Sequence, residues 1–281
     1  MKKVTLLLVA LSFLATDAFA ETWTQLNGPL DPFGAFPQWN KIVLSADGKT
    51  AFLSGSYKSN SLTYPLFFFS TNSELTWSPV AFPASIGNVN ISADGSKLMI
   101  IYATNYVSTN SGVTWDAVTG SRNFIAVASS ADVKKMVGIF PGTGGSIYVS
   151  TNFGATWKST MTLGSSSAWY SVASSADGTK LYALANDPGT LIGTIYRSTN
   201  SGATWLSTAP SVTKFIDLYG VASSADGKKA AVVGGGFIFT TTNAGASWIR
   251  QTQAPSKIYG CVTISADGTK ITAVEQSIPP G

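Results

Sequence analysis

The sequence predicts an all-β fold built from tandem repeats, and two recurring signatures are the basis of this prediction. The longer signature reads Ser-Thr-Asn-Ser-Gly-Ala-Thr-Trp at 198–205. Close copies of it end at four other tryptophans, Trp77, Trp115, Trp157 and Trp248. The shorter signature, Ser-Ala-Asp-Gly, begins at Ser45, Ser92, Ser175, Ser224 and Ser265, with a Ser-Ala-Asp-Val variant at Ser130. The two signatures alternate with a period of roughly 40–50 residues, which indicates a repeat architecture.

The longer signature, called the box below, is predicted to be a tight turn between two strands. Apolar and aromatic residues precede it, as in Ile147–Val149 and Phe237–Phe239. The Asn side chain can accept a hydrogen bond from a backbone N–H two residues on, and the Gly two positions later adopts a positive φ at little cost. The Thr-Trp pair then restarts a strand, and its indole is large enough to fill the space between neighbouring repeats.

The Ser-Ala-Asp-Gly signature, called the SADG turn below, is predicted to be a hairpin turn of the Asp-Gly type. Alternating patterns precede and follow it, as in Tyr170–Ser174 and Lys180–Leu184. Each repeat then comprises a strand, the SADG turn, a strand, a loop, a strand, the box and a last strand. Four strands in a unit of this length predict one blade of a β-propeller.

The box resembles the Asp-box, or bacterial neuraminidase repeat, which is usually written Ser-x-Asp-x-Gly-x-Thr-Trp. Asn replaces the Asp in every copy here, and Glu74 replaces the Gly of the first copy. The resemblance covers nearly all of the chain after residue 20. It implies a propeller whose box turns lie on the face opposite an active site. It implies no single activity, because Asp-box propellers include sialidases, xyloglucan-degrading glycosidases, sortilin-type receptors and photosystem II assembly factors.

Residues 1–20 are predicted to be a secretory signal peptide of bacterial type. Lys2 and Lys3 precede an apolar stretch, and Ala18-Phe19-Ala20 offers a cleavage site before Glu21. The apolar stretch is too short to span a bilayer comfortably, and no later stretch is longer. We therefore expect residues 21–281 to form one Asp-box propeller domain that is secreted or periplasmic and has no transmembrane segment. An uncleaved membrane anchor is the alternative.

The repeats predict about six four-stranded blades, with the closing blade shared between the two ends of the chain. Glu21–Thr24 looks like the tail of a box, whereas the last repeat, from Tyr259 to Glu275, has only its first two strands. Thr22–Gln25 would then supply the outer strand of that last blade. On this arithmetic the closing blade is one strand short, so either it has three strands or the chain is a fragment of a longer one.

The formal net charge of +4 suggests an anionic partner, but the placement of the lysines argues against one. About half of them follow the turn aspartates, three residues after the Asp in the case of Lys97, Lys135, Lys180, Lys229 and Lys270. Each is expected to pair weakly with the Asp of its own turn, which gives a ring of mixed charge. Aromatic residues do not interleave with this ring as a single-strand-binding surface requires, so no nucleic acid is expected.

The residue types present exclude several kinds of chemistry. The chain has no histidine and a single cysteine, Cys261. Histidine-based acid–base catalysis, histidine or thiolate metal sites and an intramolecular disulfide are therefore excluded. Cys261 is expected to be a small buried residue of an innermost strand. No metal and no cofactor are predicted, and we expect a monomer.

The connections between blades differ from repeat to repeat, and the functional site is predicted on the face that they form. Aromatic residues lie at the start of the innermost strands, with a few charged residues near them. They form either a rim suited to a glycan or peptide ligand or a plug of the central channel. In the Trp169–Tyr170 pair only one side chain can face the channel, because successive strand residues point to opposite sides. The candidate ligand-binding residues are Trp39, Arg122, Trp169, Tyr170, Asp217, Tyr219 and Tyr259.

These observations favour a non-catalytic propeller that binds a ligand or a protein partner through its loop face. A first alternative is a glycoside hydrolase of sialidase-like or glucan-cleaving type, with two carboxylates drawn from Asp31, Asp116, Asp187, Asp217 and Glu275. A sialidase also needs three arginines at its site, and Arg197 is predicted to lie on a third strand, away from that face. A second alternative is an envelope assembly factor or scaffold, which differs only in its partner.

Overall fold

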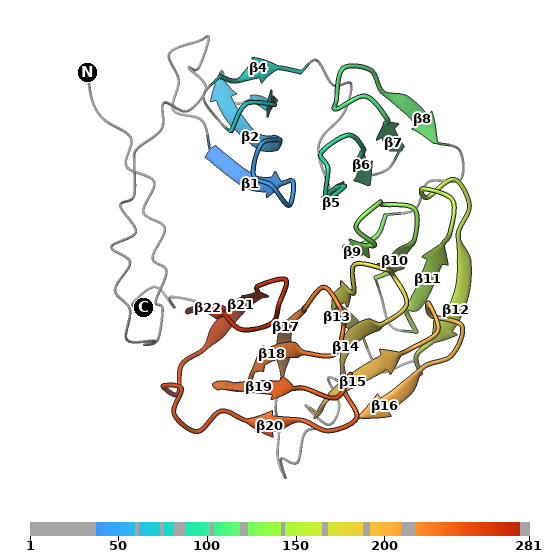
Figure 1. Cartoon of the computed structure of the whole chain (residues 1–281), viewed down its shortest axis with the longest axis vertical. Coiled ribbons are helices and arrows are strands. Elements are labelled where there is room, and N and C mark those ends of the chain that lie inside the picture. Colours follow the sequence, from blue (N-terminus) through green and yellow to red (C-terminus); the bar gives the residue numbers. More distant parts are fainter. Residues whose placement is uncertain are drawn as a thin grey trace.

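The computed structural model describes residues 38–59, 62–73, 76–80, 88–101, 104–118, 123–141, 144–164, 168–187, 192–208 and 217–275. Within these ranges the regular structure is β-strand, with no helix. The strands form five four-stranded antiparallel sheets and one two-stranded sheet. The sheets follow one another around a central opening, with the first strand of each nearest the centre (Figure 1).

Each four-stranded sheet is one blade, and its strands lie side by side in chain order. The first blade comprises β1 (Gln38–Leu44), β2 (Ala51–Ser59), β3 (Leu62–Ser70) and β4 (Ser78–Pro79). The second comprises β5 (Asn88–Ile91), β6 (Leu98–Ile101), β7 (Asn105–Ser108) and β8 (Asp116–Val118). The third comprises β9 (Ala126–Ser129), β10 (Met136–Ile139), β11 (Ser146–Ser150) and β12 (Lys158–Thr162).

The remaining three sheets complete the described chain. The fourth blade comprises β13 (Ala168–Ser174), β14 (Leu181–Asp187), β15 (Ile192–Ser198) and β16 (Leu206–Thr208). The fifth comprises β17 (Leu218–Ser223), β18 (Ala230–Gly234), β19 (Phe237–Thr241) and β20 (Ile249–Arg250). The last sheet has only β21 (Tyr259–Ile264) and β22 (Ile271–Glu275).

A ladder of backbone hydrogen bonds joins the SADG turns of successive blades. The alanine N–H of each turn donates to the alanine carbonyl of the next, at 2.7–2.9 Å. The ladder runs through Ala46, Ala93, Ala131, Ala176, Ala225 and Ala266. The innermost strands are also in contact from one sheet to the next, from β1 through β5, β9, β13 and β17 to β21. The turns and the innermost strands therefore hold the blades in a continuous arc.

Side-chain hydrogen bonds fix each SADG turn as the sequence predicts. In the second blade, Ser92 Oγ donates to Asp94 Oδ1 at 2.6 Å, and the same oxygen accepts from the N–H of Ser96 at 3.0 Å. Gly95 has φ of 71°, a conformation that glycine adopts without strain. Val133 takes the equivalent place in the variant turn at φ of 60° and is buried against the second blade. A β-branched residue at this φ is rare, and burial of its side chain compensates for the strain.

The box is a turn fixed by its Asn, but with a longer span than predicted. Asn200 Oδ1 accepts from the N–H of Thr204 at 2.9 Å, four residues on rather than two. Asn200 Nδ2 donates to Thr204 Oγ1 at 2.9 Å, so the amide closes the turn from both of its ends. Gly202 has φ of 81°, as the pattern predicts, and Ser201 before it is also positive at 57°. The N–H of Ser201 donates to Thr179 O at 2.9 Å, so box and SADG turn lie together on one face, called the turn face below.

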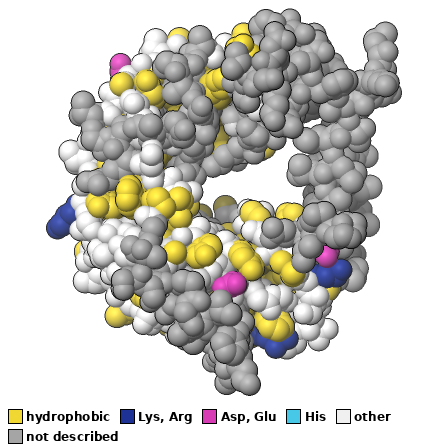
Figure 2. Space-filling view, turned by 180° about the vertical axis from the view of Figure 1, so that it is seen from behind, with side chains coloured by type: hydrophobic (Ala, Val, Ile, Leu, Met, Phe, Trp, Pro, Cys, Tyr) yellow, Lys and Arg dark blue, Asp and Glu magenta, His cyan; other side chains and the backbone are white. Residues whose placement is uncertain are grey.

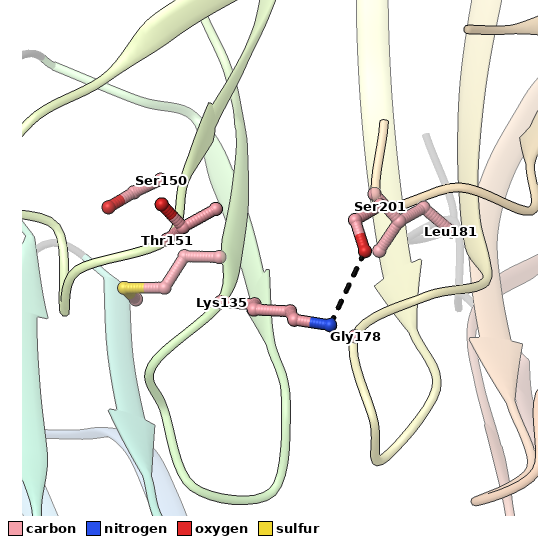
Figure 3. A pocket seen from close by; sticks show the side chains of 7 residues that line it. Lys135, Ser150, Thr151, Gly178, Leu181 and Ser201 are labelled. Atoms are coloured by element: carbon pink, nitrogen blue, oxygen red, sulfur yellow. Dashed lines mark hydrogen bonds between the residues drawn. The ribbon is translucent and has the colours of Figure 1, made fainter. Parts of the chain in front are cut away.

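The predicted pairing of lysines with their own turn aspartates is wrong for two of them. Lys135 Nζ and Lys229 Nζ each donate at 3.0 Å to the carbonyl of the turn aspartate in the following blade, Asp177 and Asp267. Figure 3 shows the Lys135 side chain crossing from its own turn toward Gly178 and Ser201. Because that glycine has no side chain, the lysine stem lies directly over it. These lysines therefore link neighbouring blades.

The last sheet is where the structure departs furthest from expectation. Cys261 is exposed rather than buried, because no described blade follows β21 and β22 to cover it. The predicted outer strand at Thr22–Gln25 lies outside the described residues, as do residues 1–20. Within the described ranges, no hydrogen bond from Ala266 continues the ladder to Ala46. A complete sixth blade and a closed ring are therefore not seen in these residues.

None of the described residues belongs to a helix that is long and apolar enough to cross a membrane.

Candidate functional site

A β-bulge recurs at the start of the innermost strands, at the end away from the turn face. Strand pairing shifts at Asn40 in β1, Tyr170 in β13, Tyr219 in β17 and Gly260 in β21. Each of these residues lies five positions before the serine of its SADG turn. A bulge leaves one residue out of the ladder and re-aims its side chain. Each bulged blade therefore presents one bulge residue at this end of the channel. This end is called the channel mouth below.

The structure divides the Trp169–Tyr170 pair between packing and exposure. Trp169 is 2% exposed and lies between the third and fourth blades. Its Nε1 donates to Gly145 O at 2.9 Å, and its ring meets the ring of Tyr196 edge-on at 5.2 Å. Tyr170, the bulge residue, is 47% exposed. Of the pair, Tyr170 is thus the side chain that a ligand can reach.

Tyr219 is the equivalent of Tyr170 on the neighbouring strand. It is 37% exposed, and β13 and β17 are in contact. The N–H of Val221 donates to Ser171 Oγ at 3.3 Å, which holds the two strands together directly beside the tyrosines. Partial burial, together with the nearby Asp217 carboxylate and Tyr170, raises the pKa of Tyr219. The phenol is therefore neutral and available as a donor at ordinary pH.

Contacts with Asn186 and Gly234 fix the backbone at Asp217 and Leu218. Asn186 in β14 accepts from the N–H of Leu218 at 3.0 Å and donates to the Leu218 carbonyl at 3.1 Å. A Cβ at Gly234 would clash with the Asp217 carbonyl, so the glycine permits this close approach. The Asp217 side chain is half-buried and has no ion-pair partner in the described part of the chain. The backbone at Asp217 is thus fixed, and its carboxylate lies near Tyr219 without an ion-pair partner among the described residues.

The other candidate residues have different places. Tyr259 is buried, and its hydroxyl donates to Pro255 O at 2.7 Å, so it serves packing in the last sheet. Trp39 lies on β1, but its side chain is outside what the structure describes, and so is the whole of Arg122. Alignment of the repeats sets Ile125 opposite Tyr170, but the sequence offers no reason to count it among the site residues. The structure shows it exposed one residue before β9, at the mouth.

The carboxylates considered for a glycosidase come from different parts of the fold. Asp116 begins the outer strand of the second blade, whereas Asp217 precedes the innermost strand of the fifth (Figure 1). Glu275 is bound by Lys257 at 3.1 Å. Asp31 and the side chain of Asp187 lie outside the described residues. No cluster of three potential metal ligands occurs within the described ranges.

The described arginines are engaged elsewhere. Arg197 lies on the third strand of its blade, as predicted, and its Nη1 donates to Ala244 O in the next box at 3.3 Å. The Arg250 guanidinium lies 3.6 Å from the centre of the Phe237 ring. Figure 2 shows hydrophobic side chains along the border of the central opening, with few charged ones near them. The described surface of the mouth is thus largely apolar and aromatic, with Asp217 as a charge without an ion-pair partner among the described residues.

Comparisons with known proteins bear on the fold. The chain matches no family model and no curated protein. Its structure is similar to a GH74 enzyme from Niastella koreensis, with a TM-score of 0.63 and 17% identity over 83% of this chain and 44% of that one. It is also similar to YCF48 bound to D1 peptide, with a TM-score of 0.59 and 12% identity over 87% of this chain and 93% of that one. The chain has a β-propeller fold.

A third similar structure is KlAtg21, in its complex with the coiled-coil of AgAtg16. Its TM-score is 0.58, with 12% identity over 85% of this chain and 79% of that one. The propeller spans less than half the length of the GH74 enzyme. The neighbours include an enzyme and binding proteins, and at these identities the likeness extends to the fold alone.

Proposed function

We propose that this chain is a secreted Asp-box β-propeller that binds a ligand or protein partner at the channel mouth, without catalysis. The proposal is carried by Tyr170 and Tyr219, which occupy equivalent bulges of neighbouring innermost strands and are both exposed, with Asp217 near Tyr219. The scaffold does not require tyrosine at this position, since the same place holds Ile125 in the third blade and Gly260 in the last sheet. Partly exposed tyrosines that the scaffold does not require are typical of binding surfaces.

The chemistry of the mouth suits stacking with directed polar contacts. A tyrosine ring can stack on a sugar face or on a peptide side chain, while its hydroxyl and the Asp217 carboxylate supply hydrogen bonds. Arg122, from the loop before the third blade, is proposed as a further polar partner. A glycan and an extended peptide both fit this description, and a screen has to include both.

The Asp-box assignment and the export of the chain are part of the proposal. The Asn200 amide bridges its turn by accepting and donating, which explains how Asn can replace Asp in this position. Residues 1–20 have the pattern of a cleaved signal. Mass measurement of the mature protein from the periplasm or medium tests this, with Glu21 expected as the first residue.

We further infer that the propeller closes between β22 and β1. Val274 is 53% exposed, whereas its equivalents in the second to fifth blades, Ile101, Ile139, Leu184 and Val233, are all 0% exposed. Ile42 is 48% exposed, whereas four of its equivalents, Val89, Val172, Val221 and Val262, are 4–8% exposed. Both residues keep the apolar character of a blade-to-blade contact. Closure with Thr22–Gln25 as the outer strand of the last sheet would bury them.

The alternatives are less well supported. A glycoside hydrolase needs two carboxyl groups roughly 5–10 Å apart; of the described acids, Asp116 lies on an outer strand and Glu275 is paired with Lys257. An envelope assembly factor or scaffold would use the same mouth with a protein partner. The two binding functions are therefore separated by the ligand and not by the site.

A glycan array and a peptide library, each probed with purified mature protein, test the proposal. Tyr170→Ala and Tyr219→Ala are each expected to weaken a hit by about 1–3 kcal/mol, or roughly 5- to 150-fold. The matched control is Val113→Ala, an exposed side chain of the second blade's box on the turn face, which should leave affinity unchanged. Screens without any hit, or hits unaffected by both mouth variants, would refute the proposal.

A further inference from the structure

The charges on the described surface are divided between the two ends of the channel. Lysines gather at the turn face, where Lys135 and Lys229 bond to the following turn and Lys49 lies 3.6 Å from Asp47. Two described cations before the last sheet, Arg250 and Lys257, already have partners. Lys257 binds Glu275, and Arg250 lies over Phe237. In the part of the chain that the structure describes, the fixed charge left without a partner at the mouth is therefore the Asp217 carboxylate.

Two aromatic faces accompany this carboxylate. Tyr170 and Tyr219 are exposed on strands joined by the bond from Val221 N–H to Ser171 Oγ. The equivalent place on the far side of Tyr219 is Gly260, which has no side chain and leaves room there. The faces of aromatic rings carry negative electrostatic potential and attract cations, and a carboxylate adds a direct ion pair.

We propose that the ligand group recognised at the channel mouth is an organic cation, of which the alkylammonium group of a lysine side chain is the simplest example. The cation lies against the rings of Tyr170 and Tyr219 and pairs with Asp217. This inference rests on the proposed function and narrows it, because it favours a basic peptide over a neutral glycan. A charge-assisted hydrogen bond to the half-buried Asp217 carboxylate is the gain that a neutral ligand could not provide.

Four short peptides of the form acetyl-Gly-X-Gly-amide test the inference by NMR titration of the mature protein. X is lysine, trimethyl-lysine, acetyl-lysine or norleucine. Acetyl-lysine is the neutral match in size for trimethyl-lysine, and norleucine is nearly so for lysine. We expect the lysine and trimethyl-lysine peptides to bind at least about tenfold more tightly than the two neutral ones, with affinity that falls as salt increases. Equal affinity across the four peptides would overturn the inference.

Two acid variants supply the second arm. Asp217→Asn should weaken the lysine peptide about tenfold and leave the norleucine peptide unchanged. The matched control is Asp116→Asn on the outer strand β8, which should change neither affinity. If Asp217→Asn has no effect, the cation is not recognised there and the inference fails. A neutral glycan that depends on both tyrosines but not on Asp217 would leave the proposed function standing and refute the cation alone. No binding of any probe at the mouth would refute both.

Discussion

The indole N–H of Trp157 gives a sharp test of how neighbouring blades are joined. Trp205 Nε1 donates to Thr160 Oγ1 and Trp248 Nε1 donates to Thr208 Oγ1, both at 3.2 Å. Each acceptor lies three residues after the box tryptophan of the preceding blade. For Trp157 that position is Val118, which has no side-chain oxygen. Trp157 Nε1 is buried and has no hydrogen-bond partner.

We expect Val118→Thr to stabilise the protein because it keeps the side-chain shape and adds the missing acceptor. A net hydrogen bond contributes about 1 kcal/mol, and an unsatisfied buried donor costs about 1–3 kcal/mol, from which burial of the new hydroxyl is subtracted. The expected net gain is about 1 kcal/mol, or a rise in Tm of about 2–4 °C for a domain of this size. The reverse change, Thr160→Val, should cost about 1–3 kcal/mol because it leaves Trp205 without its acceptor.

Urea and thermal unfolding of the variants measure these changes. The control repeats Val118→Thr in a Trp157→Phe background, where no indole donor is present and the gain should disappear. An equal gain in both backgrounds would show that the threonine acts through something other than Trp157. A neutral Thr160→Val would refute the reasoning about Trp205 as well.

Four further predictions follow from the same geometry. Asn200→Ala should lower the free energy of unfolding by about 1 kcal/mol, because it removes the side-chain hydrogen bonds that close one box, and should leave ligand affinity unchanged, because the box lies on the turn face. Lost affinity at normal stability would mean that the ligand binds the turn face and not the channel mouth. Deletion of residues 21–26 should lower Tm and promote aggregation by exposing a sheet edge, and an unchanged, monodisperse deletion variant would count against closure. Trp169→Ala should cost about 3–5 kcal/mol and Tyr170→Ala much less, as chemical denaturation will show; equal costs would contradict their assigned places. Hydrogen bonds from serine and from backbone N–H lower the pKa of Asp177 to about 2, so its stabilising effect is complete above pH 4 and disappears as pH falls toward 2; Asp177→Asn should flatten the acid limb of the stability curve.

The fold could be predicted from the sequence because the turns are specified locally. The spacing of Asn200, Gly202 and Trp205 determines a turn, a positive φ and a large side chain between blades, and all three are found. The position of Tyr170 relative to the SADG serine likewise carries the bulge, although the alternation of strand residues alone does not reveal it. Local patterns thus determine each blade and the side of each strand.

Relations between blades could not be predicted in the same way. Lys135 follows Asp132 by three residues, but this spacing does not reveal that its ammonium group reaches the Asp177 carbonyl of the next blade across Gly178. Cys261 has the pattern of a buried strand residue, but its burial depends on a neighbouring blade that the described residues do not supply. Both differences arise from packing across blade boundaries, which a single repeat does not encode.

Backbone hydrogen exchange with and without a ligand identified in the screen is the most direct test of where this propeller binds. If the channel mouth is the site, ligand should slow exchange at the start of β13 and β17, at 168–171 and 217–221, while the box at 198–205 is unchanged. Slowed exchange confined to the boxes and SADG turns, with the mouth unaffected, would contradict the central claim and place the site on the turn face.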